Sequence, residues 1–184
     1  MSSASTSRQE ALWVLRAQCG DREALELLLS SAQPALRRLL RGVAGPTDAD
    51  DLLQEVLVAV YRKLRWLETP ELFRPWAFRI ASRVAFRHLK RAARRGESPL
   101  DDAALDGLPA PEAPSPPGDE LLARLGHLTG LSPASRAVLI LHFQEEMTLP
   151  DVAAVLGLPL GTVKSRLAYG LAALRRNFGT ERRS

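Results

Sequence analysis

Apolar side chains recur along this chain with the spacing of helices. Leucines repeat at helical intervals over residues 11–29 and are interrupted near Gly20, so two helices are expected there. A short helix is predicted over residues 34–41, ended by Gly42. Residues 52–64 carry a broad apolar stripe, which predicts the clearest helix. No segment alternates steadily between apolar and polar residues, so strands are not expected.

The second half of the chain has the pattern of a helix-turn-helix. A helix is expected to begin at Ser132 and Pro133, a capping residue followed by a residue suited to the first turn. Thr148 and Asp151 have the spacing of a capping box at the start of the next helix. Gly157 ends that helix, and a second begins three residues later. Two short helices joined by a tight glycine turn are typical of the helix-turn-helix.

Composition narrows the possible protein classes. The chain has 184 residues, 46% of them hydrophobic and only one a cysteine, so an internal disulfide framework is excluded. Its histidines and its cysteine are scattered, so no metal and no cofactor are expected. Cys19 is expected to be a small buried side chain rather than a redox sensor. Neither an apolar run of membrane-spanning length nor a signal peptide is evident, so a cytoplasmic protein without membrane insertion is expected.

Charge is sharply segregated along the chain, whose net charge is +4. Residues 72–96 hold eight basic and no acidic side chains, whereas residues 97–120 hold seven acidic and no basic ones. The acidic stretch also contains six prolines, which predicts a flexible linker over residues 98–119. Two roles are open for this linker. It is either a passive tether, or a segment whose acidic residues mimic nucleic acid or contact a basic partner. The fold class expected is all-α, with small helical domains over residues 8–97 and 120–180 joined by this acidic, proline-rich linker.

The basic stretch is expected to form one face of a helix that begins at Pro75 and is ended by Gly96. Like charges spaced by three or four residues repel one another along a helix, and a polyanion such as DNA would relieve them. The alternative is a solvated basic face with the aromatic residues in the core. Aromatics beside arginine are also suited to stacking on unpaired bases. The cations are Arg79, Arg83, Arg87, Lys90 or Arg91, and Arg94, and Trp76, Phe78, Phe86 and His88 lie among them.

The second helix of the helix-turn-helix is the element that enters the major groove in such motifs. Val163 and Leu167 are expected to face inward. The opposite face then carries two cations and two hydroxyls, as contacts to bases and phosphates require. The alternative is a helical hairpin with ordinary surface charges. The expected DNA-facing residues are Thr162, Lys164, Ser165, Arg166 and Tyr169.

Three segments together resemble bacterial sigma factors of the sigma-70 family, specifically the small extracytoplasmic-function (ECF) group. DADDLLQEVLVAVYRKL (48–64) is similar to the helix with which the family grips core RNA polymerase. FRPWAFRIASRVAFRHLKRAARR (73–95) is similar to its promoter-melting and −10-reading helix. LSPASRAVLILHFQEEMTLPDVAAVLGLPLGTVKSRLAYGLAALRRNF (131–178) is similar to its −35-reading domain. The resemblance covers about residues 10–178.

This resemblance implies a transcription initiation factor, not an enzyme, that binds the β′ and β subunits of core polymerase and promoter DNA. It also implies an anti-sigma factor as a partner. The loop over residues 65–73 would receive a flipped base, and the acidic linker would follow the RNA-exit path. The implied polymerase contacts are Asp50, Asp51, Gln54 and Glu55. The implied −10 contacts are Trp76, Arg79, Arg83, Arg87, His88, Lys90 and Arg91, and Lys164, Ser165 and Arg166 would read the −35 element.

The chain departs from the family pattern at two places. Residues 149–151 read Leu-Pro-Asp where an aromatic followed by Glu is more usual, and Tyr169-Gly170 replaces a basic-Ala pair. The alternative function is a stand-alone helix-turn-helix regulator that binds duplex DNA. An enzyme is not expected, because no carboxylates cluster with His or Cys. The packing of the two domains in the free protein is not determined by the pattern.

Overall fold

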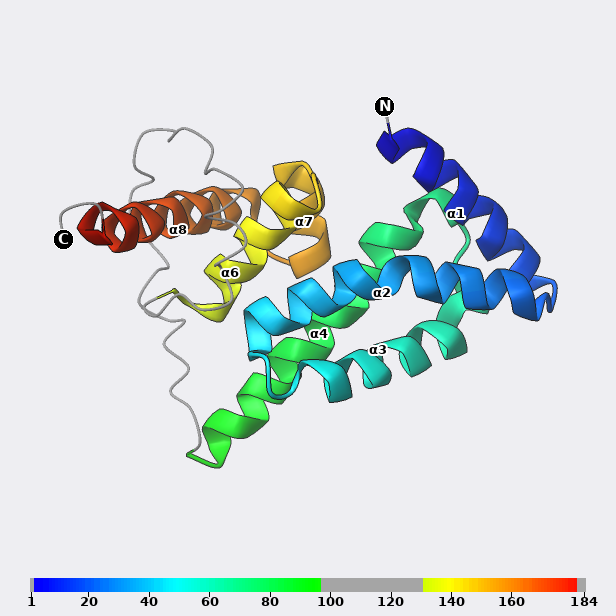
Figure 1. Ribbon diagram of the computed structural model, residues 1–184, viewed down its shortest axis with the longest axis horizontal. Helices are drawn as coiled ribbons and strands as arrows, with labels where there is room; N and C mark the ends of the chain where they lie inside the picture. The colour runs from blue at the N-terminus through cyan, green and yellow to red at the C-terminus, as the bar shows by residue number, and fades with distance from the viewer. Residues whose placement is uncertain (1, 97–130, 182–184) are drawn as a thin grey trace.

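The computed structural model describes residues 2–96 and 131–181, and every regular element in these ranges is helical (Figure 1). The all-α fold class is therefore confirmed. The predicted linker over residues 98–119 and the first residues of the second expected domain, 120–130, lie outside the described residues. The α-helices are α1 (Ser2–Gln18), α2 (Arg22–Ala44), α3 (Ala49–Lys63), α4 (Phe73–Arg94), α6 (Pro133–Leu139), α7 (Leu149–Leu156) and α8 (Leu160–Glu181), and shorter turns are η1 (Leu64–Trp66), η2 (Pro70–Leu72) and the π-helical η5 (Ile140–Gln144).

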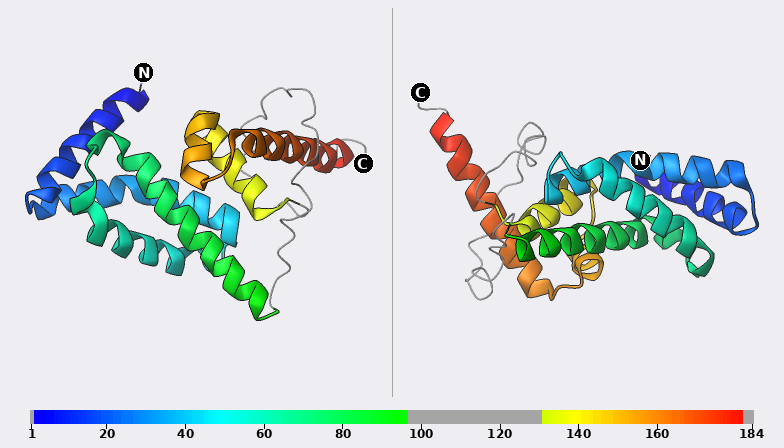
Figure 2. Two further views of the ribbon diagram at one scale, coloured as in Figure 1. Left: turned by 180° about the vertical axis from the view of Figure 1, so that it is seen from behind. Right: turned by 90° about the horizontal axis from the view of Figure 1, so that it is seen from below.

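Helix α2 is the centre of the N-terminal half, because α1, α3 and α4 all pack against it (Figures 1 and 2). Its side chains Leu28, Leu36 and Leu39 are almost completely buried. Val56 of α3 and Phe73 of α4 complete the same core. Each such side chain contributes about 1.5–3 kcal/mol by leaving water. The apolar stripes that predicted these helices are thus the faces that hold them together.

The prediction of a separate helix over residues 34–41 is wrong. Pro34 lies inside α2, which continues to Ala44 and ends at Gly45 with φ 97°. A proline inside a helix costs about 3 kcal/mol, mainly through one missing amide hydrogen bond. Leu36, Leu39 and Leu40 lie directly beyond Pro34 and are all buried. Their burial outweighs this cost and keeps the helix continuous.

Local capping signals were confirmed in the C-terminal half. The Ser135 amide donates to Ser132 Oγ at 3.2 Å, and the Asp151 amide donates to Thr148 Oγ1 at 3.3 Å. Gly157 adopts the left-handed conformation, with φ 68°, at the end of α7. These contacts satisfy amides that a helix start leaves without partners. They therefore fix where α6 and α7 begin.

The two halves of the chain pack directly on each other, which the sequence left open. Helix α6 lies against α2, and α7 lies against α4 (Figure 2). The approach is closest at Gly42, where an added Cβ atom would lie 2.1 Å from Ile140 Cδ1. Ile140 is itself only 2% exposed. Gly42, which the sequence predicted to end a helix, instead lies inside α2, where its lack of a side chain lets the π-helical turn η5 pack closely.

Polar contacts at this interface are partly desolvated. Arg38 Nη2 donates to Glu145 Oε1 at 2.8 Å, and the Glu145 side chain is 4% exposed. Burial raises the pKa of Glu145, although the bonds from Arg38 oppose that change. Arg136 Nη2 donates to the Val43 carbonyl at 3.4 Å, and burial lowers the pKa of Arg136. Since burial dominates both pKa changes, these contacts set the register of the interface more than they stabilise it.

Two further observations concern the surface. Cys19 is exposed at the end of α1, so the expectation that it would be buried is wrong. It falls in the turn between α1 and α2, where the apolar repeat has already ended. Among the described helices, none is both long and apolar enough to cross a membrane.

Neighbouring leucines of α2 provide a test of this core. Leu28 is fully buried, whereas Leu27 is 41% exposed. Leu28→Ala should lower the free energy of unfolding by about 2–5 kcal/mol, because it leaves a cavity among packed helices. Leu27→Ala, the matched control, should change it by less than about 1 kcal/mol. Denaturant titration followed by circular dichroism measures both, and equal losses would contradict the assigned core.

Candidate nucleic-acid interface

The basic face of α4 is largely exposed. Arg79, Arg83 and Arg87 follow one another by four residues on the outer side of the helix, and Phe78 and Ala81 lie on its buried side. The C-terminal part of α4, which carries Lys90 and Arg91, extends beyond the neighbouring helices (Figure 1). Trp76 and His88 are half-buried. The structure thus brings the predicted −10 residues together along one helix.

Some of these cations already have partners within the chain. Arg87 forms a hydrogen-bonded ion pair with Glu55 of α3. His88 Nε2 lies 3.3 Å from the carboxylate of Asp48. Arg79 Nη2 donates to the Ala154 carbonyl of α7 at 2.8 Å. The basic face therefore borders α3 on one side and the C-terminal half on another.

The acidic side of α3 is exposed along its first turns. Asp50, Asp51, Gln54 and Glu55 all lie on the surface, and the buried stripe of Leu52, Leu53, Val56 and Val60 occupies the opposite side. Asp50 Oδ1 lies 3.2 Å from Arg37 Nη2 of α2. Aspartates in the first turn of a helix also stabilise it through the helix dipole. The structure thus groups the four predicted polymerase contacts on a single surface.

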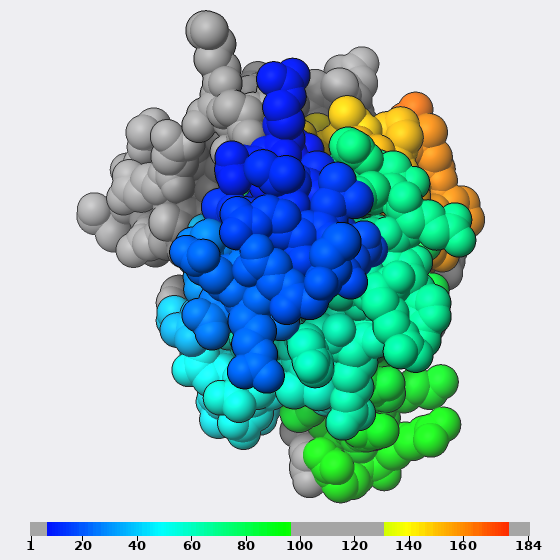
Figure 3. Space-filling view, turned by 90° about the vertical axis from the view of Figure 1, so that its right-hand side faces the viewer, coloured from blue at the N-terminus to red at the C-terminus, as the bar shows by residue number. Residues whose placement is uncertain are grey.

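The segment between α3 and α4 forms the wall of a surface cavity of ≈ 360 Å³. Trp66 is 62% exposed, and the Arg65 guanidinium stacks over its ring at 3.8 Å. Trp76 and Arg79 of α4 line the same cavity, and so does Asp151 of α7. Figure 3 shows this teal segment beside the yellow and orange helices of the C-terminal half. The family resemblance implied a role for this loop, residues 65–73, without singling out Trp66. The contribution of α7 depends on packing that no local pattern records.

The helix-turn-helix is formed by α7 and α8, as predicted. Lys164 is exposed, Thr162 and Tyr169 are half-buried, and Ser165 Oγ donates to the Gly161 carbonyl at 3.1 Å. Arg166, however, is only 5% exposed. The expectation that Lys164 and Arg166 would share the exposed face is therefore wrong.

Helical geometry explains the position of Arg166. It lies three residues after the buried Val163 and four before the buried Gly170, so all three occupy one side of α8. At Gly170 an added Cβ atom would lie 2.9 Å from Leu139 Cδ1 of α6. The glycine in the unusual Tyr169-Gly170 pair is thus explained by the close packing of α6 against α8.

Both halves of the chain match known protein families. Residues 28–95 match the family described as "Sigma-70 region 2", and residues 127–176 match "Sigma-70, region 4". RNA polymerase sigma factor NccH of Alcaligenes xylosoxydans xylosoxydans is 32% identical over 166 residues, covering 86% of this chain and 89% of the relative. RNA polymerase sigma factor CnrH of Cupriavidus metallidurans is 32% identical over 179 residues, covering 90% of this chain and 93% of the relative.

Solved structures show the same fold. CnrH in complex with the cytosolic domain of CnrY aligns with a TM-score of 0.64 and 26% identity, covering 94% of this chain and 98% of the other. RpoE of Bartonella quintana, in complex with the anti-sigma factor NepR, aligns with a TM-score of 0.61 and 23% identity, covering 84% and 96%.

Sigma factors are a non-enzymatic class of transcription initiation factors that bind RNA polymerase and promoter DNA. Within the described residues, His, Cys, Asp and Glu form no group suited to a metal ion. Both diagnostic regions are present in order, and the match extends over most of each relative. The chain therefore belongs to the sigma-70 family, in its ECF group, and is a factor that directs RNA polymerase to promoters.

Proposed function

We propose that this sigma factor binds core polymerase and promoter DNA through three separate surfaces. The exposed acids of α3 bind the β′ subunit of core polymerase, the basic face of α4 with the adjoining cavity binds the −10 element, and the N-terminal part of α8 binds the −35 element. The observation that carries this proposal is the exposed face of α4, whose cations lie in a stretch of 25 residues without an acid. Binding phosphates there releases counterions and relieves repulsion along the helix.

The acids of α3 contribute in two ways. Their negative charge attracts a basic surface of the polymerase, and complementary charge speeds association and fixes orientation. Glu55 and Asp48 also contact Arg87 and His88 of the −10 face. These pairs hold α3 and α4 in register, so that binding of polymerase and binding of DNA take place on one rigid unit.

A regulatory partner is also proposed. CnrH and the Bartonella RpoE were both solved with partner proteins, the cytosolic domain of CnrY and the anti-sigma factor NepR respectively. By similarity, we expect an anti-sigma factor to bind this chain, and we expect the chain to work in the cytoplasm beside the polymerase. A stand-alone regulator of duplex DNA is not favoured, because region 2 and region 4 are both present.

Promoter binding requires the two halves of the chain to separate. The −10 and −35 elements, as their names imply, lie roughly 25 base pairs apart, about 85 Å along B-form DNA. Here α7 contacts α4 directly, and Ala154 accepts a hydrogen bond from Arg79 of the −10 face. The packed arrangement is therefore a free form of the protein, and DNA binding competes with the contact between α4 and α7.

Charge reversal on α3 tests the polymerase surface. Asp51→Arg should weaken binding to core RNA polymerase about tenfold or more, because it places like charges together at the interface. Glu26→Arg, an exposed reversal on α2, is the matched control and should leave affinity unchanged. Fluorescence anisotropy with labelled sigma factor measures both. Normal affinity of a folded Asp51→Arg protein would contradict the assignment.

The −35 surface is tested at Lys164, since Arg166 is buried and its loss would also disturb folding. Lys164→Ala should lower initiation about tenfold on a promoter that depends on its −35 element, by removing a base or phosphate contact. The exposed Arg175, three turns further along α8, provides the control Arg175→Ala. In transcription assays on a template without a −35 element, Lys164→Ala should match wild type. Equal losses on both templates would exclude a −35 role.

A reversible cross-link tests separation of the halves. A Cβ atom at Gly42 would lie 3.5 Å from Ile140 Cγ1, so cysteines at these two positions are placed to form a disulfide. In a Cys19→Ser background, the oxidised Gly42→Cys/Ile140→Cys protein should fail to initiate transcription and should recover on reduction. Ile140→Cys alone is the control for the loss of packing. Full activity of the cross-linked protein would show that the halves need not separate.

A further inference from the structure

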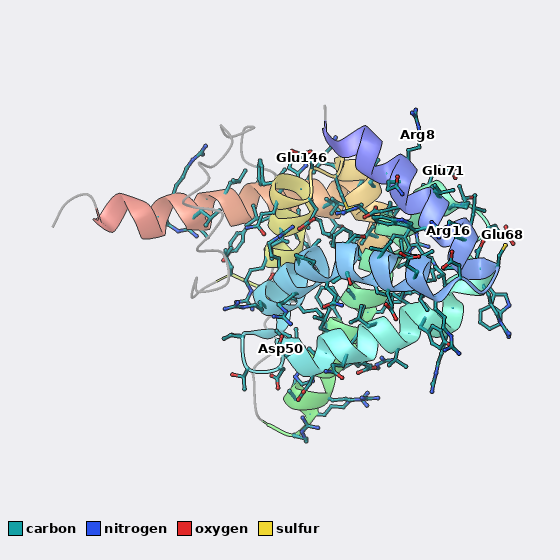
Figure 4. All side chains as sticks on the ribbon, turned by 45° about the vertical axis from the view of Figure 1, so that its right-hand side comes forward. Arg8, Arg16, Asp50, Glu68, Glu71 and Glu146 are labelled. Carbon is teal, nitrogen blue, oxygen red and sulfur yellow. The ribbon has the colours of Figure 1, made fainter. Side chains whose placement is uncertain are left out.

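Helix α1 borders the segment that joins α3 to α4. It packs on both η1 and η2 as well as on α2. Figure 4 shows Glu68 and Glu71 of that segment beside the helix that bears Arg8 and Arg16. No residue of α1 belongs to the surfaces proposed above for polymerase or DNA. Helix α1 nevertheless contacts the segment between α3 and α4 at two defined points.

The first point is the amide of Gln18, the last residue of α1. Its Nε2 donates to the carbonyls of Leu64 and Leu67, both at 2.9 Å. These carbonyls stand at the two ends of the short turn η1, which carries Arg65 and Trp66. The Leu67 amide also donates to the Leu64 carbonyl at 3.0 Å. Gln18 thus clamps both ends of the turn whose exposed tryptophan lines the cavity.

The second point is the carboxylate of Glu10, which is only 2% exposed. Arg74 Nε and Nη2, in the first turn of α4, each donate to it at 2.8 Å. Ser31 Oγ of α2 donates to it at 3.1 Å. A bidentate guanidinium–carboxylate pair has a fixed geometry. Glu10 therefore fixes the segment where it re-enters a helix.

The residues between these two points form one side of the cavity, which Trp66, Leu67, Glu68 and Thr69 line. Trp76 and Arg79 of α4 and Asp151, Ala154 and Val155 of α7 line the remainder. The two anchors lie eight residues apart on α1, about 12 Å along its axis. Because a helix is stiff over that distance, α1 holds the two ends of the segment at a set separation.

We propose that Gln18 and Glu10 are positioning residues for recognition of the −10 element. They hold the part of the cavity formed by the segment and α4, which remains when α7 separates, in the shape that accepts an unpaired base and rejects the others. This inference rests on the proposed role of the cavity in binding the −10 element. Gln18 touches no DNA itself and acts through the backbone of η1. Its loss is expected to relax the choice of base, without affecting polymerase binding or use of the −35 element.

Base preference in the −10 element is the measurement that tests this role. Full-length protein and core polymerase transcribe a promoter library with a fixed −35 element and a randomised −10 element, and start-site sequencing gives the preference at each position. Gln18→Glu is nearly isosteric and removes both donated hydrogen bonds. It should reduce the preference about fivefold to tenfold at one or two −10 positions. Glu10→Gln should relax the same positions, which provides a second variant.

Two controls separate the inference from the proposed function. Arg16→Ala alters an exposed α1 residue that pairs with Asp21 and should leave every preference unchanged. Trp66→Ala alters the cavity itself and should relax the same positions as Gln18→Glu. If Trp66→Ala changes the −10 preference and Gln18→Glu does not, the positioning role is wrong while the cavity assignment stands. If Trp66→Ala has no effect, the cavity assignment fails, and the inference fails with it.

The pattern of transcription across the library distinguishes a positioning role of Gln18 from a merely structural one. A structural defect in Gln18→Glu would lower transcription equally on all library members and would lower the melting temperature. A positioning defect changes the ratio between members instead. A uniform loss with an unchanged −10 preference would overturn the proposal.

Discussion

The molecule is organised around α2, because this helix carries apolar side chains that must be buried on most of its sides. Leu28, Leu36 and Leu39 are too apolar to be left in water, so α1, α3 and α4 cover them. The same need keeps the helix continuous through Pro34. Near its end, α2 presents Gly42, whose missing side chain lets η5 of the C-terminal half pack closely. One helix thus joins both halves of the chain.

This packing places opposite charges side by side on the surface. Because α3 and α4 both lie against α2, the acids of one helix reach the cations of the other, as Glu55 reaches Arg87. Exposed pairs of this kind add about 0–1 kcal/mol each, so they orient the helices rather than hold the fold together. The other exposed cations of α4 belong to the surface that we propose for DNA. The surface that we propose for polymerase and the surface that we propose for promoter DNA therefore adjoin on one unit, and α1 contacts the segment that joins α3 to α4.

The contact between the halves combines apolar packing with desolvated polar groups. Ile140 supplies the apolar part, and Glu145 with Arg38 supplies the polar part. Because the pKa of Glu145 is raised in the packed form, its contribution to packing is fully present at low pH and is lost as pH rises through that raised pKa. Such an interface is compatible with the separation of the halves that we propose for promoter binding.

Sequence by itself determined the elements with a local physical cause: the amphipathic helices, the caps at Ser132 and Thr148, the left-handed turn at Gly157 and the acid-free face of α4. Periodicity and capping act within a few residues, so they can be read from the chain. Packing decided the rest. It kept α2 continuous, buried Arg166, brought α7 to the cavity and placed Gln18 against Leu64 and Leu67, because each of these outcomes depends on residues far apart in the sequence that only the tertiary fold brings into contact.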